Sequence, residues 1–321
     1  MGSDWPQKEL VQAIAGECEG NPARCSVVVG AGLSQEAGYI GWSQLMMQMV
    51  ELCAPGRSKN YIAEMRKLAM TDPLGFASWA RQQNRQGYFE LLAKCFGQEG
   101  KKSFTSCHRY LLQTRFQYYM TTNFDCCLEN CAMKLKQTSG GVFYYPDYIN
   151  STAIYNREGA ICHLQGFLYR YDQYGTEIRR CPDELVLAYE DYFKIYNDVN
   201  SQIRILLESM LREQTVLFVG FSFSDPVWQR LLEKLTLLLR SPSGMNRDKH
   251  YALLPQTQHI KSSQFQKEIF RDRYSIAVEF FPTATRNKKT DFSQLAEYLK
   301  QLRDAVISYR KRINKKKPNT P

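Results

Sequence analysis

A run of β-branched residues that stops at two glycines and a serine constrains this chain more than any other feature. The order is Val27, Val28, Val29, Gly30, Ala31, Gly32, Leu33 and Ser34. The valines predict a buried strand, and the glycines would let the backbone approach a phosphate with no Cβ in the way. A helix starting after the turn would add free N–H groups. The segment predicts a phosphate cradle or, alternatively, a plain structural turn, because Gln35 stands where a dinucleotide fingerprint needs its third glycine.

Three later segments also run from an apolar strand into a polar turn. They cover residues 116–125, which end on Asn123 and Asp125, residues 160–166, and residues 215–226. Asp225 followed by Pro226 predicts the N-cap and first residue of a helix. Because open α/β sheets bind ligands at the carboxyl ends of their strands, we expect all four turns to form one site. The predicted fold class is α/β, with a parallel sheet flanked by helices.

The remaining segments complete this outline. Apolar residues at helical spacing predict helices from Trp42 onward and over 61–69, 73–83 and 88–95, which together form a helical insert at about 42–106. His108 is expected to pack on a helix leading into the second strand. Further helix is predicted over 185–212, and further strands over 251–254 and 276–281. A helix over about 291–312 should end in a frayed basic tail that contains Arg310, Lys311, Arg312, Lys315, Lys316 and Lys317.

The four turns, taken in order, resemble those of the sirtuin-like NAD-binding superfamily, and in particular the sirtuin-like domains of bacterial antiphage systems that hydrolyse NAD. The resemblance rests on Gly-Ala-Gly-x-Ser, Thr-Thr-Asn-Phe-Asp, a glycine at 166 and Gly-Phe-Ser-Phe-Ser-Asp-Pro, and it spans about residues 20–285. It implies a Rossmann-like sheet over residues 1–290, with the insert covering the nicotinamide side, and a C-terminal helix and basic tail over 291–321. It implies that Gly30, Ala31, Gly32 and Ser34 bind the phosphates, and that Asn123 and Asp125 face the nicotinamide ribose. It also implies that Gly220 and Ser222 contact the adenosine side of NAD, and that Thr121, Phe221 and Asp225 belong to the NAD-binding set.

Two departures from the family pattern affect the expected chemistry. Protein-deacylating sirtuins carry a zinc module of two Cys-x-x-Cys pairs, whereas none of the ten cysteines here forms such a pair. No zinc or other metal site is therefore expected, and Cys126, Cys127 and Cys131 are interpreted as small buried thiols.

The second departure is at the usual catalytic histidine, directly before the glycine of the third turn, where this chain has Gln165. An amide cannot take up a proton, so the general base is missing from its usual place. His163 would face the same way on a strand, roughly 6 to 7 Å away, and could act through a water. A structural hydrogen bond is the alternative role for His163.

Composition and charge narrow the setting. The chain has 321 residues and ten cysteines, and we find neither a secretory signal nor an apolar run long enough to span a membrane. We expect a soluble cytoplasmic protein with reduced thiols. The net charge of +10 is concentrated near the C-terminus, so any nucleic-acid contact would use that basic tail alone.

The functional prediction is an NAD hydrolase that cleaves the nicotinamide N-glycosidic bond as an antiphage effector, with Asn123 orienting the reactants and His163 and Gln165 as further candidate catalytic residues. NAD is then the substrate, and a homo-oligomer and a defence-system partner protein are expected. The alternative is a catalytically weakened sensor that binds NAD or a related nucleotide. A deacylase or ADP-ribosyltransferase is the third and least favoured alternative.

Overall fold

The computed structural model describes residues 5–18, 21–22, 24–147, 154, 157–171, 177–198, 200–239, 249–256, 260–286 and 289–316. Its centre is a seven-stranded, wholly parallel sheet with the order β11-β10-β9-β3-β4-β6-β5. The strands are β3 (Cys25–Val29), β4 (Tyr118–Thr121), β5 (Val142–Tyr144), β6 (Ala160–His163), β9 (Thr215–Val219), β10 (His250–Gln256) and β11 (Ile276–Pro282). The predicted α/β class with a parallel sheet is confirmed.

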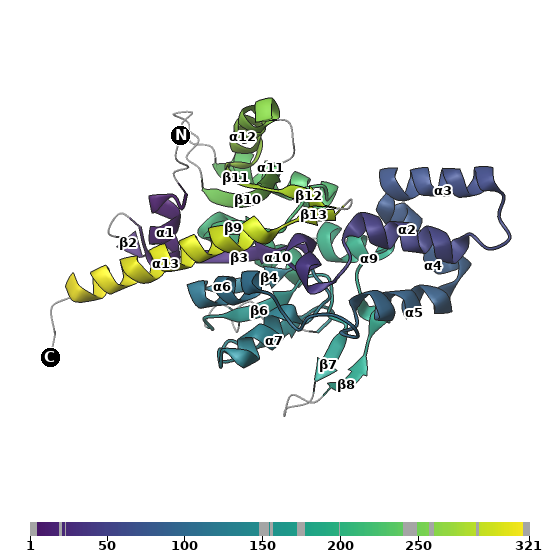
Figure 1. Cartoon of the computed structure of the whole chain (residues 1–321), viewed down its shortest axis with the longest axis horizontal. Helices are drawn as coiled ribbons and strands as arrows, with labels where there is room; N and C mark the ends of the chain where they lie inside the picture. The colour runs from purple at the N-terminus through teal and green to yellow at the C-terminus, as the bar shows by residue number, and fades with distance from the viewer. Residues whose placement is uncertain are drawn as a thin grey trace.

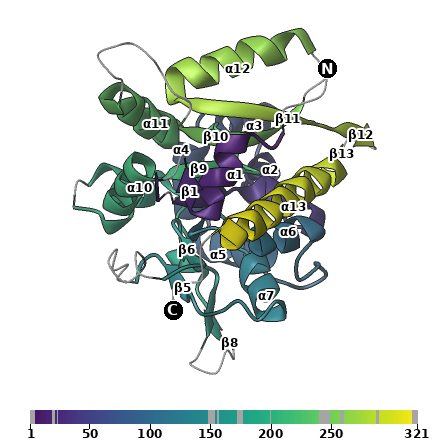
Figure 2. The same ribbon diagram turned by 90° about the vertical axis from the view of Figure 1, so that its left-hand side faces the viewer.

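Helices cover both faces of this sheet, as the two views show (Figures 1 and 2). One face carries α10 (Gln202–Glu213), α11 (Pro226–Leu239) and α12 (Ile260–Tyr274), and the other carries α1 (Lys8–Ala15), α6 (Ser106–Thr114), α7 (Cys127–Lys134) and α13 (Ser293–Lys316). Strand residues alternate between the two cores: Val28 packs with the first group, and Val27 and Val29 with the second. This alternation explains why the strand reads as an unbroken apolar run.

A bundle of helices lies beyond the sheet at one end of the molecule (Figure 1). It comprises α2 (Trp42–Cys53), α3 (Lys59–Thr71), α4 (Pro73–Gln83) and α5 (Arg85–Phe96). These helices share a core of their own, to which Phe124 and Phe167 from the strand-end turns contribute. The expected helical insert is therefore present, and it packs against the turns that follow β4 and β6.

The turn after β3 differs from the prediction. Instead of a helix, two short 3₁₀ turns follow, η1 (Ala31–Leu33) and η2 (Gln35–Ala37), and the first α-helix, α2, begins only at Trp42. The η2 turn ends at Gly38, which has a left-handed φ of 101°. The turn therefore offers backbone N–H groups from tight turns and lacks the α-helix dipole that we expected.

The segment of residues 182–213 is helical only in pieces. It contains η3 (Pro182–Glu184), α9 (Tyr189–Tyr192), a π-helical turn (Phe193–Asn197) and then α10. Arg81 of α4 pairs with Glu190 at 3.0 Å and Asp191 at 2.8 Å, and so joins α9 to the insert. Small two-stranded sheets complete the described elements: β1 (Glu17–Cys18) with β2 (Asn21–Pro22), β7 (Tyr169–Tyr171) with β8 (Glu177–Arg180), and β12 (Ala284–Arg286) with β13 (Lys289–Asp291).

Helix α13 extends further than predicted and is anchored to the sheet domain. It continues through Lys316, so most of the basic residues expected in a frayed tail are helical. Leu295, Leu299 and Leu302 are buried in the core shared with α1 and α6. Arg310 is not a solvated tail residue, because it donates hydrogen bonds to the carbonyl oxygens of Ile14 and Thr114. No helix among the described residues combines the length and apolarity needed to cross a bilayer.

Candidate functional site

The turns after β3 and β9 pack directly against each other through glycine backbone. Gly30 N–H donates to Val219 O at 3.0 Å, and Gly32 N–H donates to Gly220 O at 2.9 Å. A Cβ on Gly30 would lie 2.5 Å from Gly220 O, and a Cβ on Gly220 would lie 2.4 Å from Leu33 N. Gly220 also has a left-handed φ of 65°. Glycine is therefore required at these positions for the two turns to pack together, and this requirement does not depend on a bound phosphate.

Asn123 is the residue that joins the second turn to the first. Its Nδ2 donates to Gly30 O and to Ser34 Oγ, both at 3.2 Å, and the side chain is 8% exposed. Because a carbonyl oxygen only accepts, the nitrogen must face Gly30, and the amide orientation is fixed. Asn123 Oδ1 is buried and accepts no hydrogen bond from any described residue. The turn thus presents one unsatisfied acceptor whose direction is set by its own amide nitrogen.

The backbone of the same turn is also held on two sides. Thr121 Oγ1 donates to Val29 O at 3.0 Å and accepts from Asn123 N–H at 2.9 Å. Asp125 Oδ1 accepts from Cys127 N–H at 3.0 Å, at the start of α7. Polar side chains that follow a strand therefore serve first to shape the turn. The structure brings Asn123 together with Gly30 and Ser34, and Thr121 and Asp125 hold the turn that carries Asn123.

His163 has both ring nitrogens occupied within the protein. Nδ1 donates to Asn123 O at 2.8 Å, and Nε2 lies 2.7 Å from Oε1 of Glu129 on α7. The ring stacks on Phe167, with centroids 4.2 Å apart. Burial alone would lower the pKa of His163, but the charge and hydrogen bond of Glu129, together with the bond to Asn123, outweigh it and raise the pKa. Neither nitrogen is free to take a proton from a water.

Gln165 contacts a different set of residues. Its Nε2 donates to the hydroxyls of Tyr192 at 2.7 Å and Tyr196 at 3.1 Å. The expectation that His163 and Gln165 face the same way is wrong, because β6 ends at His163 and the strand alternation does not continue to residue 165. The usual place of the catalytic base is therefore filled by an amide held between two phenols.

Asp225 belongs to this second network. Its Oδ1 accepts from Val227 N–H at 2.8 Å, as predicted for the N-cap of α11, and its carboxylate also bonds the Tyr192 hydroxyl. Burial raises the pKa of Asp225. Phe221 lies in the apolar core beside Trp228, with centroids 5.1 Å apart. Ser222 is exposed and pairs with Ser224 Oγ at 2.6 Å, so among the described residues it does not join the Asn123 cluster.

Two neighbours of the site are not predicted by the sequence: Glu129, and His108, for which only packing is expected. The structure gathers His108, Asp125 and Cys127 so closely that one ligand atom of each lies within 4.8 Å of the others. Spacing along the chain gave no such cluster, because the residues come from α6, the β4 turn and α7. Burial raises the pKa of the Cys127 thiol far above its usual range, with further increases from Asp125, so the thiol is protonated.

The structure describes the side chains of nine of the ten cysteines, and all nine are free and buried. This confirms the interpretation of Cys126, Cys127 and Cys131 as buried thiols. Burial raises the pKa of Cys131 to about 12. Such thiols are poor nucleophiles and poor metal ligands as they stand.

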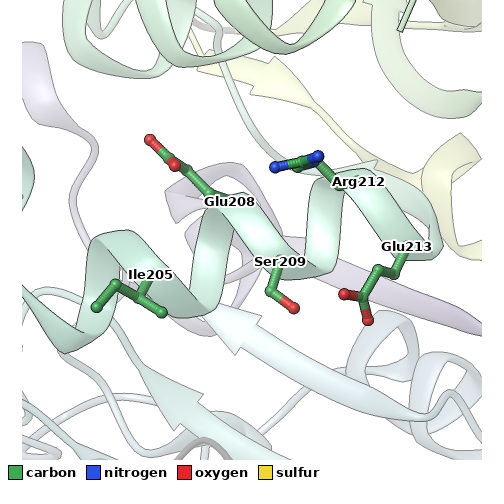
Figure 3. A pocket seen from close by; sticks show the side chains of 5 residues that line it. All are labelled: Ile205, Glu208, Ser209, Arg212 and Glu213. Atoms are coloured by element: carbon green, nitrogen blue, oxygen red, sulfur yellow. The ribbon is translucent and has the colours of Figure 1, made fainter. Parts of the chain in front are cut away.

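The cavity drawn in Figure 3 lies away from this site. It measures about 530 Å³ and is lined by one face of α10, at Ile205, Glu208, Ser209, Arg212 and Glu213. Helix α10 ends just before β9 begins, so this cavity extends toward the amino edge of the sheet, whereas the four turns follow the carboxyl ends. Glu208 is already paired with Arg204 at 3.1 Å and Lys234 at 3.2 Å.

The fold and the site together define an α/β protein whose glycine turn, Asn123 turn and β9 turn meet at the carboxyl edge of a parallel sheet, the edge at which such sheets bind ligands. A family model described as a SIR2-like domain matches residues 117–278. The chain belongs to this SIR2-like family.

Curated relatives are similar to most of the chain. Three proteins named NAD(+) hydrolase ThsA are each 24% identical to this chain. The match to the protein of Bacillus cereus (strain MSX-D12) extends over 234 residues, which are 73% of this chain and 43% of the relative. The matches to the proteins of Cytobacillus dafuensis and Enterococcus faecium extend over 262 and 325 residues, which are 81% and 97% of this chain and 46% and 59% of the relatives, respectively. The chain spans about half the length of the curated relatives it matches.

Proposed function

We propose that this protein binds NAD at the carboxyl edge of the sheet and hydrolyses its nicotinamide N-glycosidic bond, as an NAD-depleting antiphage effector. The name of the ThsA relatives and the SIR2-like family support this activity. The observation that carries the proposal is the buried, unpartnered Asn123 Oδ1, because a buried acceptor without a donor is costly unless a ligand satisfies it.

Asn123 would act by orientation. Its Nδ2 already donates to Gly30 O and Ser34 Oγ, so only Oδ1 is left for a ligand, and an amide oxygen can only accept a hydrogen bond. We assign it a ribose hydroxyl of NAD or the attacking water as donor. Asp125, which is 6% exposed, would place negative charge near the ribosyl cation that forms as the bond breaks. The phosphates are assigned to the backbone of Gly30, Ala31 and Gly32 and to Ser34. Gly220 and Ser222 are assigned to the adenosine side, and Thr121, Phe221 and Asp225 complete the proposed NAD-binding set.

Hydrolysis of this bond makes small demands on acid–base groups. The leaving nitrogen is a pyridinium, so it departs as neutral nicotinamide with the bonding electron pair and needs no proton. Water then adds to C1′, and its extra proton passes to solvent. Because the cation is strongly electrophilic, the water needs orientation more than deprotonation. An active hydrolase is therefore compatible with Gln165 in place of histidine, while a nearby base would still add rate.

One observation favours a second function. Since both nitrogens of His163 are bonded within the protein, His163 does not directly replace the missing base. The protein would then bind NAD or a related nucleotide and report its occupancy to a partner. In either function, we assign the chain to the cytoplasm, in a homo-oligomer, with a defence-system protein as partner and with no zinc.

The experiment is an assay of nicotinamide release from NAD by the purified chain, alone and with its genomic neighbours, beside calorimetric titration with NAD. Asn123→Ala should lower release at least about a hundredfold by removing the orienting group. Asn60→Ala, at an exposed position on α3, is the control and should not change the rate. Binding without release under all conditions would support the sensor, and absence of NAD binding would refute both functions.

A further inference from the structure

His108 is buried completely and lies between two hydroxyl residues. It occupies the third position of α6, where Thr105 N–H donates to its Nδ1 at 3.2 Å. Thr105 Oγ1 lies 2.9 Å from the same nitrogen. Because Nδ1 accepts from a backbone amide, the proton of a neutral ring must sit on Nε2. Burial lowers the pKa of His108 to about 4, so the ring is neutral at physiological pH.

The Nε2–H of His108 faces the site. It lies 3.5 Å from Ser34 Oγ, which also accepts from Asn123 Nδ2 at 3.2 Å. A hydroxyl oxygen has two acceptor sites and one proton. When both acceptor sites are filled, the Ser34 proton must be donated elsewhere. Ser34 is therefore a donor and Asn123 Oδ1 an acceptor, and the two are neighbours at the carboxyl edge of the sheet.

We propose that His108 is a positioning residue, which fixes Ser34 as a hydrogen-bond donor and Asn123 as an acceptor toward the nucleotide. The inference rests on the proposed function. Ser34 Oγ–H would donate to an oxygen that carries no proton, such as a phosphate oxygen, while Asn123 Oδ1 would accept from a ribose hydroxyl. A ligand with a phosphate and a ribose hydroxyl at this spacing satisfies both groups.

Two other roles for His108 must be separated from this one. The first is purely local, because Thr105 and His108 form a capping box that a glutamine at the same position would also make. The second is metal binding with Asp125 and Cys127. The proton on Nε2 and the protonated Cys127 thiol oppose metal binding in the described arrangement.

The test is a double-mutant cycle between His108 and Ser34, read by NAD affinity in calorimetry and by the rate of nicotinamide release. His108→Leu should weaken NAD binding about tenfold, the value of one orienting hydrogen bond. In a Ser34→Ala background, His108→Leu should cause little further loss of NAD affinity, because His108 acts through Ser34. His108→Gln should recover most of the loss, since its amide can accept from Thr105 and donate to Ser34.

The controls separate positioning from stability and from the proposed function. His250→Leu replaces another fully buried histidine, on β10, and should leave NAD affinity unchanged. Imidazole ¹⁵N shifts should show the Nε2–H form of His108 and a change at Nε2 in Ser34→Ala. Equal losses from His108→Leu in both backgrounds, an Nδ1–H ring or one bound zinc per chain would overturn the inference. If no nicotinamide is released, the double-mutant cycle in NAD affinity and the imidazole ¹⁵N shifts still test whether His108 positions Ser34.

Discussion

Glu129 Oε1 and His163 Nε2 lie 2.7 Å apart in the interior, and the opposite nitrogen of that ring donates to Asn123 O. The pair therefore fixes the backbone of Asn123, the residue to which we assign the contact with the nucleotide. Glu129 Oε2 is also buried and has no hydrogen-bond partner among the described residues. We interpret His163 as a support for Asn123, in place of the base suggested by its position in the sequence.

The first prediction concerns the pH dependence of stability. The pKa of His163 is raised in the folded protein, so its stabilising contribution is complete below the ordinary value of about 6.5 and is lost as pH rises through the folded pKa. Glu129→Gln removes the charge that holds the proton. The unfolding free energy of the wild type minus that of this variant should fall as pH rises above about 6.5.

Denaturant titrations from pH 5.5 to 8.5, a range that brackets that ordinary value of about 6.5, measure this difference. Glu51→Gln, at an exposed position of α2, is the matched control and should give a difference independent of pH. A flat profile for Glu129→Gln would mean that His163 is neutral in the folded state.

The second prediction concerns the contact between the β3 and β9 turns. Gly220→Ala combines a left-handed φ of 65° with a Cβ only 2.4 Å from Leu33 N. Gly56→Ala has a comparable φ of 74°, but no atom lies within 4 Å of its Cβ. Gly56→Ala should therefore cost about 1 kcal/mol of backbone strain, and Gly220→Ala clearly more. Thermal unfolding of the two variants measures the contribution of the turn contact, and equal losses would refute it.

The same geometry decides how Gly32→Val can be used as a test of phosphate binding. If the β3 turn holds the phosphates, valine would put a branched side chain in their place. A Cβ at Gly32 would already lie 3.0 Å from the backbone of Gly220, so the larger side chain would displace the turn itself. Loss of NAD binding in this variant would not separate a phosphate contact from turn packing.

The sequence predicted those parts of the molecule whose signals are local. The Val27–Val29 strand and the Asp225 cap depend on neighbouring residues, and both are confirmed. The contacts of His108 with Ser34 and of His163 with Glu129 join residues far apart in the chain, so no periodicity reports them. Thr105 three residues before His108 was a usable local signal for a capping box, although the third residue there is usually glutamate or glutamine.

The third prediction concerns zinc. His108, Asp125 and Cys127 form a cluster that the spacing of cysteines did not reveal. Zinc would require a Cys127 thiolate, whereas burial raises the pKa of that thiol far above its usual range. Elemental analysis of the purified chain should find no stoichiometric zinc, and a chelator should not shift the unfolding temperature. One zinc per chain, lost in Cys127→Ala, would establish a metal site and reopen the deacylase alternative.

The fourth prediction concerns the C-terminal helix. The Arg310 guanidinium donates to Thr114 O at 2.8 Å, Ile14 O at 2.7 Å and Arg115 O at 2.9 Å, and so ties α13 to the ends of α1 and α6. Arg310→Ala should lower the unfolding free energy by about 1–3 kcal/mol, because it leaves these carbonyls unpaired. Lys311→Ala, at an exposed position, should stay within about 0.5 kcal/mol of the wild type. Equal effects would mean that α13 is not held by this residue.

The last prediction concerns Gln165, on which the enzyme and the sensor differ. Gln165 donates to Tyr192 and Tyr196, so Gln165→Ala leaves two buried phenols without that donor and should cost stability, with a modest effect on the rate. Gln165→His would place an imidazole beside Tyr192, with an ordinary pKa of about 6.5, near the working pH. A base there should raise nicotinamide release by up to ~10²- to 10⁴-fold.

The comparison is made on the protein alone and together with the proposed defence-system partner, with Asn123→Ala as the inactive reference. His163→Ala should also lower the rate, because it frees the Asn123 backbone. Release by the wild type that increases in Gln165→His would support a hydrolase working without its usual base. If the wild type releases no nicotinamide and Gln165→His does, the hydrolase proposal is refuted. The protein would then be a nucleotide-binding relative that has lost its catalytic base.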